Sequence, residues 1–290
     1  MTQEPTILFG VGATKAGTTW LYDYLSSHPD CHLRSIKELH YFDAIDAGRV
    51  DQQLQSRYAA AGRLVTLAHK SSNVASAEAR QTDLADWIDV LELPSESSAA
   101  YLGYLTAGQG DRRVVADITP SYALLSAARL KKMAAISPDT RFVYLMRDPV
   151  ARLWSHVRMV ASRTAGNFPA KAREILRNIV NGETSSVTNR GDYAATLTRL
   201  QSAIDPSRLL VMFQETLMTT PGVTRLCRFL GIRTQPADFS RRVHEGTPLA
   251  MTVEDHASAR AFLRSQYEFV ARQFSDIPDA WRMNMNEVAR

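Results

Sequence analysis

The first residues that could do chemistry lie in a short loop near the amino end of the chain. The sequence GATKAGTT begins at Gly12, carries Lys15 near its centre and has its second glycine at Gly17. Between a strand and a helix, such a loop presents backbone N–H groups and the positive end of the helix dipole to an anion. We therefore expect it to bind a phosphate group.

The position of the lysine separates this loop from the nucleoside-triphosphate loop GxxxxGK[ST]. The two glycines have the same spacing, but the residue after Gly17 is Thr18, and the lysine lies inside the loop at position 15. In an ATPase the lysine reaches the β and γ phosphates and the neighbouring hydroxyl holds magnesium. The shifted lysine favours a different phosphate arrangement with no metal ion, although an ordinary strand-to-helix turn is the simpler alternative.

A second candidate site follows the most strongly β-forming run of the chain. In RFVYLMRDPVARLWSH, Arg147 comes directly after the run and Ser155 follows eight positions later, within an expected helix. An arginine at a strand end offers paired donors to a phosphate, and a hydroxyl from the next helix can complete the site. The alternative is that Arg147 pairs with Asp148 and that Ser155 only bonds its own helix.

Two titratable side chains in IKELHYFD could move a proton. Glu38 and His40 are two residues apart, which in an extended segment places both side chains on one side. Either could accept the proton of a reacting hydroxyl. The alternatives are that Glu38 pairs with Lys37, and that His40 is a hydrogen-bonded imidazole beside an aromatic cluster.

The elements that position these residues alternate between strand and helix. Apolar or β-branched runs predict strands at residues 6–12, 31–35, 114–118, 141–146 and 208–213. Helical periodicity predicts helices at residues 20–28, 121–136, 150–163, 219–231 and 253–274. This order predicts an α/β protein, a P-loop-type three-layer fold with a central parallel sheet flanked by helices. With no linker or repeat, we expect one domain over residues 1–290, with a variable, mostly helical excursion at 44–111.

Composition excludes several classes of protein. The chain has 290 residues, of which 45% are hydrophobic and 22% charged, which excludes disordered and fibrous proteins. Its net charge is +4, but lysines and arginines are scattered, so we expect no nucleic acid partner. The amino terminus has neither the pattern of a signal peptide nor that of a membrane span, which predicts a cytoplasmic protein without a membrane partner. Cys31 and Cys227 are expected to be buried thiols, and a homo-oligomer stays open.

The loop and the strand-end arginine together resemble the PAPS-dependent sulfotransferases, nearest to the carbohydrate (heparan sulfate-type) branch and its bacterial relatives. GATKAGTTWL is similar to the family's 5'-phosphosulfate loop, and RDPVARLWS to its 3'-phosphate element. The resemblance implies 3'-phosphoadenylyl sulfate (PAPS) as donor, with Trp20 near the adenine. The donor-binding residues it implies are Lys15, Ala16, Gly17, Thr18, Thr19, Trp20, Arg147 and Ser155. A family G-x-Y element corresponds to RGDY here and places Tyr193 near the 3'-phosphate or the acceptor, unless this tyrosine only packs.

The resemblance also implies catalytic roles. KELHYFD is similar to the E-x-H-F-F-D stretch of carbohydrate sulfotransferases, whose glutamate is the proposed base, so Glu38 is the first choice, with Lys15 stabilising the leaving phosphate. His40 is the second choice, since the cytosolic phenol and steroid enzymes use a histidine. DITPSY resembles the family's E-x-[ST]-P-x-Y step, which places Asp117 beside the acceptor or as a cap of the next helix. Ile118 stands where the heparan-type members often have lysine.

The function implied is in-line transfer of a sulfuryl group from PAPS to a hydroxyl or amine of a small-molecule or carbohydrate acceptor, which the sequence does not identify. The rival hypotheses are a P-loop kinase or NTPase and a catalytically inactive nucleotide-binding scaffold. Towards the carboxyl end, Arg241, Arg242 and His244 could cover the nucleotide or form a solvated charge cluster.

Overall fold

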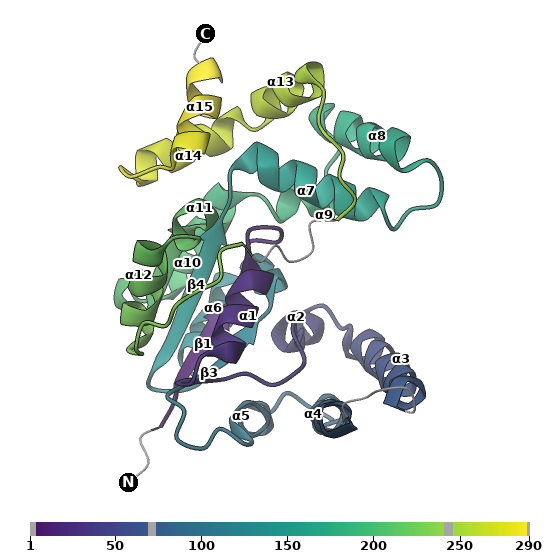
Figure 1. The fold of residues 1–290 in the computed structure, drawn as a ribbon, viewed down its shortest axis with the longest axis vertical. Helices are drawn as coiled ribbons and strands as arrows, with labels where there is room; N and C mark the ends of the chain where they lie inside the picture. The colour runs from purple at the N-terminus through teal and green to yellow at the C-terminus, as the bar shows by residue number, and fades with distance from the viewer. Residues whose placement is uncertain (1–3, 69–73, 241–245, 289–290) are drawn as a thin grey trace.

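A computed structural model describes residues 4–68, 74–240 and 246–288, and its centre is a parallel sheet of five strands in the order β2-β3-β1-β4-β5 (Figure 1). The strands are β1 (Thr6–Gly10), β2 (Cys31–His32), β3 (Val114–Ile118), β4 (Thr140–Met146) and β5 (Leu209–Phe213). The predicted α/β fold with a central parallel sheet flanked by helices is confirmed. Each predicted strand is present, although β2 has only two residues.

The middle of the sheet is buried on both faces. Leu8 of β1 lies opposite Ala116 of β3 and Arg141 of β4, and every residue of β1 and β3 is buried. Burial on both faces explains why these strands read as continuous apolar runs rather than as alternating ones. The carboxyl ends of β1, β3 and β4 therefore meet at one edge of the sheet.

Helices cover both faces of the sheet and its carboxyl edge. Those before β4 are α1 (Thr18–Ser27), α2 (Tyr41–Asp46), α3 (Val50–Ala68), α4 (Val74–Leu91), α5 (Ser98–Thr106), the 3-10 turn η1 (Pro120–Leu124) and α6 (Ala127–Ala134). Those after it are α7 (Pro149–Ala161), α8 (Phe168–Val180), α9 (Ser186–Asn189), α10 (Tyr193–Ala203), the 3-10 turn η2 (Pro206–Arg208), α11 (Gln214–Leu217), α12 (Thr220–Leu230), α13 (Val253–Phe262), α14 (Arg264–Gln273) and α15 (Asp279–Val288). Because parallel crossovers are right-handed, α1 and α6 lie on opposite faces of the sheet.

The helices α2, α3, α4 and α5 form a helical layer beside the sheet (Figure 1). Its attachment is ionic as well as apolar, since buried Arg34 pairs with Asp83 at 2.7 Å. Buried Arg129 of α6 likewise binds Asp46 and Glu96. Removing the acidic partners would leave a buried guanidinium group unpaired, so these ion pairs help to hold the layer against the sheet.

Two of the predicted helices are each divided in two in the structure. The predicted helix at 121–136 is interrupted, because η1 ends at Leu124 and Ser126 caps a new helix by accepting from the backbone N–H of Arg129 at 3.1 Å. The predicted helix at 253–274 is also two helices, α13 and α14, which meet at Leu263. Periodicity alone misses such breaks, because the apolar face continues across them.

The last three helices, α13, α14 and α15, lie over the carboxyl end of the sheet (Figure 1). Trp281 of α15 is fully buried and stacks near Tyr193 at 5.9 Å between ring centroids. Among the described residues, no helix combines the length and the apolar character that crossing a membrane needs.

Candidate active site at the phosphate loop

The glycine loop joins β1 to α1 and leaves its amide donors open. Gly17 is the N-cap of α1 with φ 92°, and it contributes no capping side chain. The first N–H groups of a helix have no partner within the helix, so those of Thr18, Thr19 and Trp20 are available to a ligand. The left-handed conformation of Gly17 and of Lys15, with φ 69°, turns the loop around this open centre.

Lys15 is surrounded by cations. Burial, and after it the charge of Arg147, lowers the pKa of Lys15, and three further cations act in the same direction. These are Arg158, Arg163 and Lys37. Within the described residues the Lys15 ammonium has no carboxylate partner. A bound anion would stabilise such a group of like charges, and anion binding at this loop stays a prediction.

Arg147 lies where β4 ends, beside the loop. Its Nη1 donates to the backbone oxygen of Lys15 at 3.3 Å, so the structure brings the two predicted cations together. Tyr193 is fully buried, and its hydroxyl donates to the carbonyl oxygen of Arg147 at 2.6 Å and accepts from its N–H at 3.2 Å. Tyr193 therefore fixes the backbone of Arg147 from behind.

The residue after Arg147 is held by the carboxyl-terminal helices. Asp148 caps α7 through Ala151, and its other oxygen accepts from Tyr267 at 2.7 Å and from Asn284 at 2.9 Å. The strand end is thus positioned by both ends of the chain, since Arg147 contacts Lys15 of the loop and Asp148 contacts Tyr267 and Asn284 of α14 and α15.

A cavity of about 720 Å³ opens beside Arg147. One wall is α7, through Trp154 and Arg158, and the facing wall includes Met251 and Met283 from the carboxyl-terminal part. Ser155, the residue after Trp154, is buried, and its hydroxyl has no hydrogen-bond partner within the described residues.

Trp20 and Ala16 are enclosed by protein. The Trp20 ring stacks on Tyr24 and Phe239, at centroid distances of 5.5 and 6.0 Å, and its Nε1 donates to the backbone oxygen of Asp238. Ala16 is fully buried and its N–H bonds Ala13 within the loop. The three basic residues predicted near a covering loop, Arg241, Arg242 and His244, lie outside the described residues.

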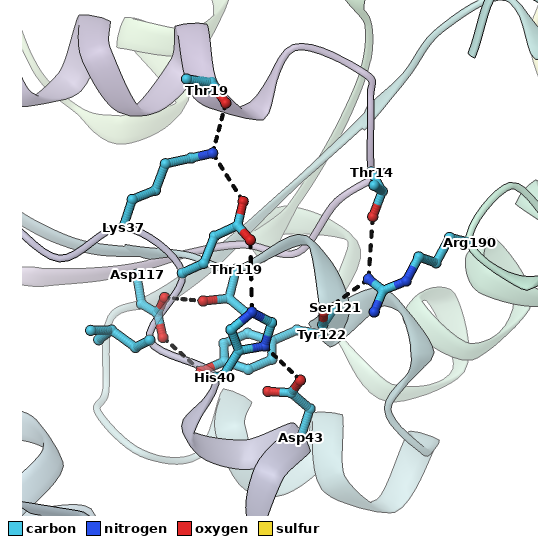
Figure 2. Close-up of polar contacts among 12 residues, drawn as sticks. Thr14, Thr19, Lys37, His40, Asp43, Asp117, Thr119, Ser121, Tyr122 and Arg190 are labelled. Carbon is cyan, nitrogen blue, oxygen red and sulfur yellow. Dashed lines mark hydrogen bonds and ion pairs between the residues drawn. The ribbon is translucent and has the colours of Figure 1, made fainter. Parts of the chain in front are cut away.

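Glu38 and His40 do meet, but not through an extended segment. Both have left-handed backbones, with φ 60° and 56°, so the expected strand-like alternation was wrong. His40 Nε2 lies 3.7 Å from Glu38 Oε2, and His40 Nδ1 lies 2.8 Å from Asp43 Oδ2. Lys37 Nζ lies 3.0 Å from the other oxygen of Glu38 and donates to Thr19 Oγ1 at 2.7 Å. Figure 2 shows this chain of contacts running from Asp43 to the start of α1.

In this series of contacts, Glu38 and His40 each stabilise the charged form of the other. Burial alone would raise the pKa of Glu38, but the contact with the His40 imidazole and the charge of Lys37 lower it to about 2. Burial alone would lower the pKa of His40, but Asp43 and Glu38 raise it to about 9. At neutral pH Glu38 is therefore a carboxylate and His40 a cation.

Asp117 has neither of its expected roles. It is 2% exposed and accepts from the hydroxyls of Tyr101 and Tyr122 at 2.8 Å and of Thr119 at 2.6 Å. The next turn is capped by Thr119 instead, without a side-chain bond. Burial raises the pKa of Asp117. Its three hydroxyl partners use its acceptor capacity, so it stabilises the core beneath the site.

Sequence reasoning missed several polar residues around the loop. Arg190 Nη1 donates to Ser121 Oγ at 2.8 Å and to Thr14 Oγ1 at 3.3 Å, and Arg57 donates to the backbone oxygen of Glu38 at 2.7 Å. Asp43 could have been found from its spacing, since it follows His40 by one helical turn. Arg57 carried no signal and Arg190 only that of the RGDY element, because the fold alone brings α3 and the end of α9 to this loop.

Comparison with known proteins gives a consistent result. The model of the sulfotransferase family matches residues 5–236. Carbohydrate sulfotransferase 15 of Rattus norvegicus is 28% identical over 179 residues, which are 59% of this chain and 30% of that protein. Heparan sulfate glucosamine 3-O-sulfotransferase 6 of Homo sapiens is 25% identical over 185 residues, 62% of this chain and 53% of that protein. The chain thus spans between about a third and a half of the length of these relatives.

A solved structure has the same fold. The crystal structure of a sulfotransferase from Alicyclobacillus acidocaldarius matches with a TM-score of 0.62 at 20% identity. The match covers 97% of this chain and 99% of that one, so it includes the helices that lie beyond the family match.

Proposed function

The chain belongs to the sulfotransferase family, and from this premise we propose that it moves a sulfuryl group from PAPS to a hydroxyl or amine of a small-molecule or carbohydrate acceptor. The observation that carries the proposal is the pairing, in one site, of a cation-rich phosphate loop with an ionised glutamate. Lys37 joins the two, because it contacts both Thr19 and Glu38.

The loop suits the 5'-phosphosulfate end of the donor. Its open amides and the Lys15 ammonium, which has no acidic partner within the described residues, supply positive charge where negative charge grows on the leaving phosphate. These groups can do this without a metal ion, and PAPS, when bound, supplies an activated sulfuryl group. Arg147 is suited to the 3'-phosphate, because Tyr193 and Lys15 hold it at the loop and it faces an open cavity.

Glu38 is the proposed base. It takes the proton of the acceptor while the acceptor oxygen or nitrogen forms its bond to sulfur, and the bond from sulfur to the bridging oxygen breaks. The electron pair of that bond stays on the 5'-phosphate, beside Lys15. His40 is less suited to the proton transfer, since its raised pKa, about 9, leaves it already protonated at neutral pH.

A pKa of about 2 makes free Glu38 a weak base. The depression comes from the neighbouring cations, and a polyanionic donor next to Lys15 and Lys37 would offset their charge. We therefore expect the pKa of Glu38 to rise when the donor binds, which brings it closer to the range useful for catalysis.

The test is formation of 3',5'-bisphosphoadenosine from PAPS with a panel of phenols, sugars and amines. We expect at least one acceptor to stimulate release of the bisphosphate, and Glu38→Gln to reduce that stimulated rate by about 100-fold or more while the nucleotide still binds. Glu183→Gln, an exposed glutamate outside the site, is the matched control. A Glu38→Gln enzyme with normal turnover would remove the base from the proposal.

A further inference from the structure

The guanidinium of Arg190 lies against the phosphate loop and contacts neutral groups there. Its contacts are the neutral hydroxyls of Thr14 and Ser121, at 3.3 and 2.8 Å (Figure 2). In the part of the chain that the structure describes, no carboxylate lies within ion-pair distance of Arg190. Most of its five N–H donors are therefore free for a ligand.

The surroundings of Arg190 are strongly positive. His156, on the neighbouring α7, is buried, and its pKa is lowered to about 3 by burial first and then by the charges of Arg152 and Arg190. Lys15 and Arg163 act in the same direction. Cations gathered in this way repel one another unless an anion binds between them, so the arrangement itself indicates a ligand.

Arg190 is also held in place before any ligand arrives. Arg152, which is 1% exposed, donates to the backbone oxygen of Val187 at 3.0 Å and so anchors α9, the helix that Arg190 directly follows. Gly191 permits this, because a side chain there would meet the Arg152 guanidinium. A fixed cation needs no reorganisation when charge develops next to it.

The two hydroxyls attach Arg190 both to the loop and to the turn η1 that follows β3. Thr14 precedes Lys15 in the loop. Ser121 precedes Tyr122, whose hydroxyl accepts from the N–H of Tyr41, the residue after His40. Arg190 is therefore linked through η1 to the segment that carries His40, whereas Arg147 lies at the end of β4.

We propose that Arg190 binds the non-bridging oxygens of the transferable sulfuryl group, and so distinguishes the sulfated donor from the desulfated product. This inference rests on the proposed function. Arg190 takes no proton and forms no covalent bond, since the acceptor proton goes to Glu38 and the leaving electron pair to the 5'-phosphate. Its paired donors suit the oxygens of a sulfuryl group throughout the in-line transfer.

The experiment compares two ligands by calorimetry without acceptor: PAPS and 3',5'-bisphosphoadenosine, which lacks the sulfuryl group. We expect Arg190→Gln to lower the affinity for PAPS by about 10-fold or more and the affinity for the bisphosphate by less than about 2-fold. Ser121→Ala removes one hydrogen bond that orients Arg190. It should also lower the affinity for PAPS more than that for the bisphosphate, but by a smaller factor than Arg190→Gln. Arg173→Gln removes one charge from an exposed arginine of α8 and should change neither affinity.

Equal weakening of both ligands by Arg190→Gln would overturn the inference, because Arg190 would then act on the phosphates. Unchanged affinity for both would also overturn it, because Arg190 would then make no contact that distinguishes the sulfated donor. Failure of the wild-type protein to bind either ligand would instead refute the donor itself, and with it the proposed function. Unchanged thermal midpoints of the variants show that each is folded.

Discussion

The ammonium of Lys37 lies 2.7 Å from the hydroxyl of Thr19, and this contact joins the segment that carries the proposed base to the helix that begins at the phosphate loop. Lys37 also touches Glu38 at 3.0 Å. A donor bound at the loop and an acceptor bound at Glu38 would therefore both sense the same lysine. The arrangement explains how binding at one end of the site can change the basicity of the other.

Replacing Lys37 should move the acid side of the pH profile. Its charge is one cause of the low pKa of Glu38, so Lys37→Gln should raise that pKa from about 2 towards the ordinary carboxylate range. The acid limb of kcat/KM then shifts to higher pH. Lys132→Gln, at an exposed position of α6, is the control, and an acid limb that does not move would show that Lys37 does not act on the base.

His40 should control the alkaline side. Its pKa is raised to about 9, so its cation stabilises the folded site fully below its ordinary pKa, near 6.5, and this contribution is lost as the pH rises through about 9. We expect turnover to fall with an apparent pKa near 9, and His40→Gln to remove this limb while lowering turnover about 10-fold at neutral pH. Activity that rises as His40 loses its proton, together with a loss of turnover of about 100-fold or more in His40→Gln, would make the imidazole the base.

Gly17→Ala should damage the loop more than the fold. The backbone φ of 92° disfavours a side chain, and a Cβ there would lie 3.1 Å from Gln214 Cγ. We expect unfolding to become easier by about 1–2 kcal/mol and affinity for 3',5'-bisphosphoadenosine to fall about 10-fold. Gly103→Ala in α5, where a side chain meets open space, should be neutral or slightly stabilising in urea denaturation and leave nucleotide affinity unchanged.

Asp117 should matter for stability rather than for chemistry. Asp117→Ala leaves three buried hydroxyls without their acceptor, so we expect a loss of about 3 kcal/mol in the free energy of unfolding. Asp117→Asn keeps one acceptor oxygen and should lose about 1 kcal/mol. Urea denaturation measures both, and an alanine variant as stable as the wild type would contradict the role in the core.

The sequence was most informative where local chemistry and local structure coincide. The loop around Lys15 and the strand end at Arg147 were predictable, because a glycine turn and a β-branched run are signals over a few residues. The pairing of Glu38 with His40 was predicted for the wrong reason, since two left-handed residues rather than a strand bring them together. A positive φ angle at a residue other than glycine has no reliable signal in the sequence.

Residues that reach the site from distant elements could not be predicted. Arg57, Arg190 and Asn284 approach it from α3, α9 and α15, and only tertiary packing decides this. The buried role of Asp117 was missed because its tyrosine partner Tyr101 comes from the helical layer, whose sequence pattern is weak. Contacts of this kind between distant elements can be identified only once the tertiary structure is known.

The most direct test of the account is calorimetric titration of 3',5'-bisphosphoadenosine, and of ADP and ATP with magnesium, into the wild-type protein and Arg147→Ala. The account predicts that the bisphosphate binds without metal, in preference to ADP and ATP, and that Arg147→Ala weakens it by at least about 10-fold. Preference for ATP with magnesium, or no binding of the bisphosphate, would contradict the central claim that this site holds the donor of a sulfuryl group.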